Sequence, residues 1–120
     1  MTSAIEDGEA TDIRVIVAFE WTFHAYQETL AAAIRILRPD AEVITIEPEK
    51  IGEAAKRFGP DVVIGSTFDE AEVEGVPVWV ELSPDPSRAS RVRMYGDYSE
   101  IVNPTLDKLL VILEEATREN

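Results

Sequence analysis

The sequence has 120 residues, of which 24 are acidic and 11 are basic, so its formal net charge at pH 7 is −13. A field of this sign repels phosphate backbones and argues against a nucleic-acid partner. The apolar runs are only a few residues long, which argues against any association with a membrane. Cysteine is absent, which excludes disulfides and thiolate chemistry and agrees with a cytoplasmic protein. We expect no cofactor and no metal.

The first twelve residues differ in composition from the rest of the chain. They carry four acidic residues, no basic residue and little apolar area. They also lack the basic region and apolar core of a signal peptide. We therefore expect residues 1–12 to form a flexible acidic tail, followed by a single α/β domain over residues 13–118.

Strands and helices alternate in the first half of this domain. Residues 13–19 are almost continuously apolar, as in a parallel strand that is buried on both faces. Helical spacing of apolar residues then predicts a helix over 22–38, with Thr22 as its cap. Residues 41–46 predict a second strand, and residues 48–58 a second helix that ends at Gly59.

The second half begins with two more strands, predicted over 61–65 and 76–82. Residues 91–95 and 98–102 also have strand-like patterns, and Gly96-Asp97 between them is typical of a hairpin turn. Residues 84–100 could therefore form a hairpin, or a loop followed by a strand.

The last predicted helix begins at Asn103-Pro104, because asparagine caps helices well and proline suits their first turn. Its buried face carries leucines at helical spacing. Strands that alternate with helices imply a parallel sheet with right-handed crossovers.

Four short segments carry a resemblance to a known family. Residues 14–18 lead to the point where an acidic pair would stand, and residues 60–66 are similar to a segment that ends in a phosphoacceptor aspartate. Residues 77–80 are similar to a fourth strand, and residues 101–104 to a fifth strand followed by lysine and proline. In this order they resemble the receiver domain of bacterial response regulators.

This resemblance implies a flavodoxin-like, three-layer α/β fold with a five-stranded, mainly parallel sheet in the order 2-1-3-4-5. The first and last helices are expected on one face and the second helix on the other. The segments 66–76 and 84–88 are too short or too loop-like for full helices. The third and fourth helices of a receiver are therefore expected to be shortened or missing.

The residues that perform receiver chemistry are almost all replaced. That chemistry needs two acids for magnesium, a carboxylate nucleophile, a hydroxyl and a lysine. The residues at these positions are Phe19 and Glu20 for the acids, Ser66 for the nucleophile, Leu82 or Ser83 for the hydroxyl, and Asn103 for the lysine. We therefore predict a degenerate receiver-like domain that is not phosphorylated.

Polar residues at the predicted strand ends form a candidate ligand site, since doubly wound sheets bind ligands there. Its members are Glu20, His24, Ser66, Thr67 and Ser83. The serine and threonine could bind a small anion. A catalytic Ser-His-acid trio is less favoured, because no Gly-x-Ser-x-Gly turn is present and polar residues at a helix start usually cap backbone amides.

A second candidate site is a protein interface made by Trp79, Arg91, Arg93 and Tyr95. The short connections leave Trp79 on an uncovered face, which predicts a homodimer. Two alternatives stay open. The arginines could form a solvated edge paired with carboxylates such as Glu81. The 66–76 segment, with Phe68 and Val73, could itself cover Trp79.

Three functions follow in order of preference. The first is a non-catalytic signalling or scaffolding module that works through protein contacts, as a homodimer or with a protein partner in a signalling pathway. The second is a sensor of a small ligand or anion at the strand-end cleft near Glu20 and Ser66. The third is an enzyme of unknown reaction.

Overall fold

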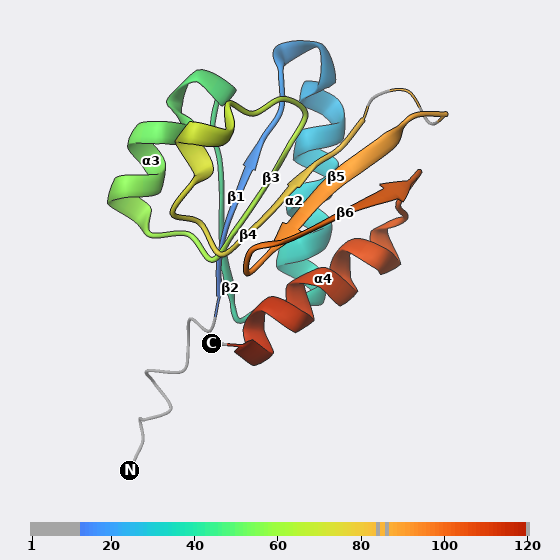
Figure 1. Ribbon diagram of the computed structural model, residues 1–120. Helices are drawn as coiled ribbons and strands as arrows, with labels where there is room; N and C mark the ends of the chain where they lie inside the picture. The colour runs from blue at the N-terminus through green and yellow to red at the C-terminus, as the bar shows by residue number, and fades with distance from the viewer. Residues whose placement is uncertain (1–12, 84, 86, 120) are drawn as a thin grey trace.

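The sheet is mixed, and its last two strands reverse direction. The computed structural model describes residues 13–83, 85 and 87–119. The predicted acidic tail, residues 1–12, lies outside this part. The strands are β1 (Ile13–Ala18), β2 (Ala41–Thr45), β3 (Val62–Gly65), β4 (Val78–Glu81), β5 (Ala89–Met94) and β6 (Asp97–Val102). The helices are α2 (His24–Leu37), α3 (Ile51–Phe58) and α4 (Leu106–Glu119) (Figure 1).

The strand order is β2-β1-β3-β4-β5-β6, so the predicted order 2-1-3-4-5 holds for the first five strands. The directions do not. β1 to β4 are parallel, but β5 is antiparallel to β4 and β6 is antiparallel to β5. The prediction of five mainly parallel strands was therefore wrong. Only residues 82–88 connect β4 to β5, and a parallel crossover needs a dozen residues or more.

β5 and β6 form the hairpin suggested by the sequence, but its turn is Tyr95-Gly96, one residue earlier than predicted. Met94 pairs with Asp97 across the turn, so the loop has two residues. Their φ angles are 50° and 91°. Both values are positive, which is the signature of the type I′ turn that suits the twist of a hairpin. Tyr95 therefore lies in the turn and not in the strand.

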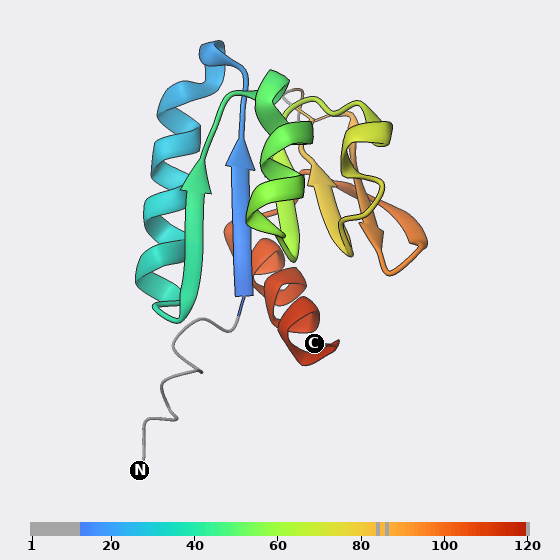
Figure 2. The same cartoon turned by 90° about the vertical axis from the view of Figure 1, so that its left-hand side faces the viewer.

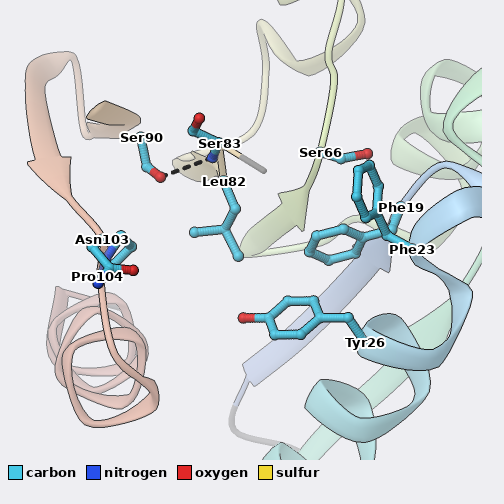
Figure 3. A pocket seen from close by; sticks show the side chains of 9 residues that line it. All are labelled: Phe19, Phe23, Tyr26, Ser66, Leu82, Ser83, Ser90, Asn103 and Pro104. Atoms are coloured by element: carbon cyan, nitrogen blue, oxygen red, sulfur yellow. Dashed lines mark hydrogen bonds between the residues drawn. The ribbon is translucent and has the colours of Figure 1, made fainter. Parts of the chain in front are cut away.

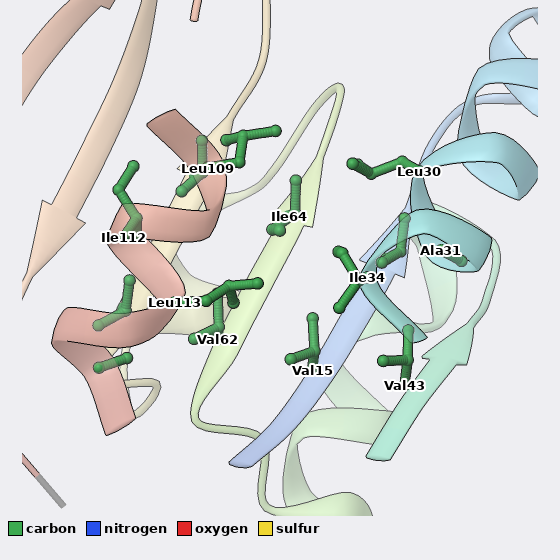
Figure 4. Close-up of a cluster of buried hydrophobic side chains, with 14 of the residues drawn as sticks. Val15, Leu30, Ala31, Ile34, Val43, Val62, Ile64, Leu109, Ile112 and Leu113 are labelled. Atoms are coloured by element: carbon green, nitrogen blue, oxygen red, sulfur yellow. The ribbon is translucent and has the colours of Figure 1, made fainter. Parts of the chain in front are cut away.

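One face of the sheet is covered by α2 and α4, as predicted. Figure 4 shows Leu30 and Ile34 of α2 and Leu113 of α4 packed over β1 and β3 on the same side of the sheet. Val80 of β4 belongs to the same cluster. This apolar layer is the main core of the domain, and burial of its aliphatic side chains is the principal source of stability.

The opposite face is covered by α3 and by a 3-10 turn at Glu70–Val73, which stands where a receiver carries its third helix (Figure 2). Ile51 of α3, Val73 and Trp79 pack together there. The described residues between β4 and β5 contain no helix. Within the described part of the chain, β3 is thus followed by a 3-10 turn in place of a full helix, and β4 by no helix.

Two helix starts differ from the prediction. Thr105, not Asn103, caps α4, since its Oγ1 accepts a hydrogen bond from the Lys108 N–H at 3.3 Å. Asn103 has a φ of 50° and lies in the link from β6 to α4. Thr22 lies inside a 3-10 turn, Trp21–Phe23, that precedes α2, and makes no cap.

Candidate functional site

The carboxyl ends of β1 and β3 are joined by Ser66. Its Oγ accepts a hydrogen bond from the Glu20 N–H at 3.0 Å, and the side chain is only 9% exposed. Gly65 precedes it, and a Cβ at this position would lie 2.2 Å from the Ala18 carbonyl oxygen. Glycine therefore lets the two strand ends approach closely enough for the serine to reach the Glu20 amide.

The five candidate ligand residues are divided between two pockets on either side of this link. Ser66 and Ser83 line one of about 360 Å³, which lies between the start of α2 and the link that leads into α4 and is called here the α2–α4 pocket (Figure 3). Glu20, His24 and Thr67 line another of about 620 Å³, called here the acidic pocket. The five residues therefore lie at one edge of the sheet, as expected, but they line two pockets and not one.

The α2–α4 pocket has an apolar wall. Phe19 and Leu82 are buried in it, and Phe23 and Pro104 are half-buried. The Tyr26 ring packs edge-on against Phe19, with 5.3 Å between the ring centroids. Burial raises the pKa of the Tyr26 hydroxyl above its ordinary value of 10.0, so at neutral pH this group is a hydrogen-bond donor.

The polar groups of this pocket are uncharged. Ser90 is 2% exposed, and its Oγ accepts a hydrogen bond from the Ser83 N–H at 2.9 Å. The Ser83 hydroxyl donates to the Asp85 carbonyl oxygen at 3.1 Å. Asn103 completes the rim. No acid, lysine, arginine or histidine is among the described lining residues, so nothing there balances the charge of an ion.

The position of β5 explains why the α2–α4 pocket is open. In the receiver arrangement expected from the sequence, the strand before Asn103 would pair directly with β4. Here β5 lies between β4 and β6, so the link that carries Asn103 begins one strand farther out. Neighbouring strands lie about 4.8 Å apart. The first turn of α4 is thereby held away from α2, and Leu82 forms the floor between them.

The acidic pocket is chemically different. Glu28, Glu47 and Glu49 line it in addition to Glu20. The ring of His24 lies against Trp21 with 4.5 Å between their centroids, and Trp21 is largely exposed. Within the described part of the chain, no set of acidic or histidine residues has the arrangement of a metal site.

The Ser-His-acid trio is not assembled. The Ser66 oxygen is bonded to the Glu20 amide, and Glu20 Oε2 accepts from the Thr67 hydroxyl at 3.3 Å. Among the described residues, no hydrogen bond joins His24 to Ser66 or to Glu20. The arrangement therefore lacks the contact between base and nucleophile that nucleophilic catalysis requires.

The candidate interface residue Trp79 is covered by its own chain. It is 3% exposed and meets Phe68 edge-on, with 5.7 Å between the ring centroids. Val73 and Val76 complete the cover. The alternative in which the 66–76 segment folds over Trp79 is confirmed, and the uncovered tryptophan from which a dimer was predicted does not exist.

The other candidate interface residues have separate surroundings. Arg91 bonds through Nε to Glu81 at 2.6 Å and through Nη1 to Glu70 at 2.8 Å, which raises its pKa further, chiefly through the bond to Glu81. The pairing with Glu81 is therefore confirmed. Arg93 is exposed, with no ion pair to a described carboxylate. Tyr95 donates its hydroxyl to the Ala116 carbonyl oxygen of α4 at 3.0 Å. Tyr95 lies in the hairpin turn and therefore does not share a strand face with the two arginines.

Three important residues were missed from the sequence. Gln27 is buried, and its Oε1 accepts from the Phe19 N–H at 2.8 Å, which fixes the end of β1. Its place between Phe23 and Leu30 at helical spacing could have revealed it as an inward polar residue. Tyr26 has the spacing of the apolar residues of its helix, which does not reveal a pocket residue. Ser90 carried no signal, because its role depends on the β4–β5 connection.

Comparisons with known proteins give a likeness of fold only. No family model and no curated protein matches the sequence. A crystal structure of a HypX variant from Aquifex aeolicus is similar over 88% of this chain and 27% of that chain, with a TM-score of 0.53 and 15% sequence identity. The chain thus spans about a quarter of the HypX chain. Within the described residues, no helix is long and apolar enough to cross a membrane.

Proposed function

We propose that this chain is a non-catalytic, receiver-like module that is not phosphorylated and acts through protein contacts. Ser66 stands where the resemblance places the phosphoacceptor, and a serine cannot form an acyl phosphate. Its oxygen already accepts the Glu20 amide. Asn103 stands at the lysine position and carries no charge, so an anionic phosphoryl group would lack its counter-ion.

The outer face of the β5–β6 hairpin is the observation that carries the contact function. This hairpin face consists of Arg93, Tyr98, Glu100 and Val102, all exposed; Tyr98 is 49% and Val102 65% exposed. It lies opposite α4, because Met94 and Ile101 point to the α4 side and pack into the main core. The 3-10 turn at Glu70–Val73 reaches β5 through the bond of Glu70 to Arg91, but it leaves these four side chains exposed.

A second copy of this chain is the partner that the proposal names. The hairpin face carries both signs of charge, with Arg93 and Glu100 beside the apolar Val102. A two-fold axis places the same patch on itself, so each arginine can meet a carboxylate of the other copy. The homodimer predicted from the sequence is retained, with the hairpin face in place of Trp79.

Light scattering at tens of micromolar tests this proposal. We expect a dimer mass for the unchanged chain and a shift to monomer for Arg93→Glu. Arg57→Glu on α3 makes the same charge change at an exposed site away from the hairpin and should leave the dimer in place. A monomer mass for the unchanged chain would contradict the homodimer.

Treatment with acetyl phosphate and magnesium tests the receiver-like part of the proposal. We expect the mass of the chain to stay unchanged, because no carboxylate stands at the Ser66 position. A stoichiometric gain of one phosphoryl group would overturn the assignment as a degenerate receiver.

The second candidate function is a small-ligand sensor. The α2–α4 pocket favours it, because an apolar wall with a few converging polar groups is the usual form of a ligand site.

A further inference from the structure

We propose that the α2–α4 pocket binds a small, planar, uncharged molecule that presents a carbonyl-type acceptor. This inference deepens the ligand-sensor candidate and does not depend on the hairpin face or on dimer formation. The ligand proposed here is neutral, whereas the sequence suggested a small anion for the strand-end cleft.

The first argument is the unused donor capacity of the pocket. The Ser66 and Ser90 oxygens each accept a backbone N–H, but neither hydroxyl hydrogen has an acceptor among the described residues. Both side chains are more than nine-tenths buried. Tyr26 is 47% exposed, and its hydroxyl, which has no hydrogen-bond partner in the described part of the chain, points across the pocket in Figure 3 as a further donor. Buried donors normally find an acceptor, so a ligand with acceptor oxygens fits this pocket.

The second argument is shape. Phe19, Phe23 and Leu82 provide aromatic and aliphatic surface on the α2 side and the floor, and Pro104 faces them from the α4 side (Figure 3). Two rings and a proline offer flat surfaces against which a planar ligand can stack. The volume of about 360 Å³ lies at the lower end of the range for small-molecule sites.

The third argument is charge. No ionised side chain lines the described part of the pocket, and the whole chain carries a net charge of −13. An anion would lose its hydration without gaining a cationic partner, and a cation would find no carboxylate. A cation would instead be drawn to the acidic pocket, beyond the Ser66–Glu20 link.

Three probes of nearly identical shape separate these charge classes: benzamide is neutral, benzoate is an anion and benzamidinium is a cation. Binding to the full chain is followed by amide NMR titration. We expect benzamide to bind in the millimolar range typical of a fragment. Benzoate and benzamidinium should bind this pocket at least about tenfold more weakly. The amides that shift with benzamide should surround Tyr26, Leu82 and Ser90.

Matched variants test the contacts. Tyr26→Phe removes one hydroxyl and should weaken benzamide binding about threefold to tenfold. Tyr98→Phe removes a hydroxyl from the hairpin face and should leave the affinity unchanged. Asn103→Asp keeps the side-chain size and tolerates the positive φ. It should reverse the preference, so that benzamidinium binds more tightly than benzamide.

The results that would overturn the inference are distinct from those for the hairpin. Benzoate or benzamidinium binding to the pocket as tightly as benzamide would exclude a neutral ligand. Absence of binding by all three probes, or shifts confined to the acidic pocket, would exclude this pocket as the site. These outcomes need only the unchanged chain, so they hold even if a variant fails to fold. None of these outcomes tests whether the chain forms a dimer.

Discussion

Ser66 shows how a residue at a predicted catalytic position can serve the fold. Its hydroxyl is buried and accepts a hydrogen bond from the Glu20 N–H between two strand ends. Ser66→Ala leaves this part-buried N–H without its acceptor and should lower the free energy of unfolding by about 1–2 kcal/mol. Chemical denaturation measures this change. Thr67→Val, at an exposed neighbour bonded to Glu20, should cost less than about 1 kcal/mol. Equal losses for both variants would mean that Ser66 has no special role.

Tyr26 gives a prediction on pH dependence. Burial raises its pKa above 10.0 in the folded chain, so folding favours the neutral phenol. The stabilisation linked to this shift is complete below pH 10.0 and is lost as the pH rises through the folded pKa. Denaturation at several alkaline pH values should show a steeper loss of stability in the unchanged chain than in Tyr26→Phe. Identical slopes would show that the Tyr26 hydroxyl is not shielded from water.

At the scale of elements, the hairpin depends on the conformation of its turn. Gly96 has a φ of 91°, and a Cβ added there would meet open space, so a substitution meets only backbone strain. Gly96→Ala should cost about 1–2 kcal/mol of folding free energy. Gly75→Ala is the control, because its surroundings are equally open and its φ is not positive. Thermal or chemical unfolding of both variants checks this, and an equal effect would contradict the assigned turn.

The strands and helices that the sequence predicted well are those with a strong local pattern. The apolar runs that became β1 and β3 and the helical stripe of α2 needed no tertiary information. The direction of β5 is a non-local property. It followed from the short connection 82–88, whereas the resemblance to a receiver suggested a parallel fifth strand.

Only some of the residues of the candidate site were predicted from the sequence. Ser66 and Ser83 were found because they end strands of a parallel sheet. Ser90 was not, because only the antiparallel return of the chain brings it beside Ser83. The division into a neutral and an acidic pocket depends on the Ser66–Glu20 hydrogen bond, which no spacing in the sequence reveals.

At the scale of the whole molecule, burial of Trp79 must be a property of the single chain if the 66–76 segment covers it. Trp21→Phe leaves Trp79 as the only tryptophan. Its emission should be blue-shifted and resist quenching by acrylamide, and both features should persist on dilution to nanomolar concentration. Phe68→Ala in this background removes part of the cover and should increase quenching. A red shift on dilution of the parent would mean that a second copy buries Trp79.

The net charge of −13 sets the conditions under which two copies can associate. Two such chains repel at long range, while the contacts of the hairpin face act only at short range. Raising the ionic strength from about 0.01 M to about 0.15 M shortens the Debye length from about 30 Å to about 8 Å. The repulsion is then screened more strongly than the contacts, so the dimer fraction measured by light scattering should rise with salt.

Two variants separate the long-range and local effects of charge on this equilibrium. Arg57→Glu changes the net charge from −13 to −15 at a site on α3, so it should need more salt for the same dimer fraction. Arg93→Glu makes the same change in net charge but also reverses the charge of the exposed arginine of the hairpin face, so it should stay monomeric at every salt concentration. If both variants respond to salt in the same way, net charge alone governs association and the hairpin face is not the interface. A dimer fraction that falls with salt in the unchanged chain would instead show that ion pairs outweigh the repulsion between the two copies.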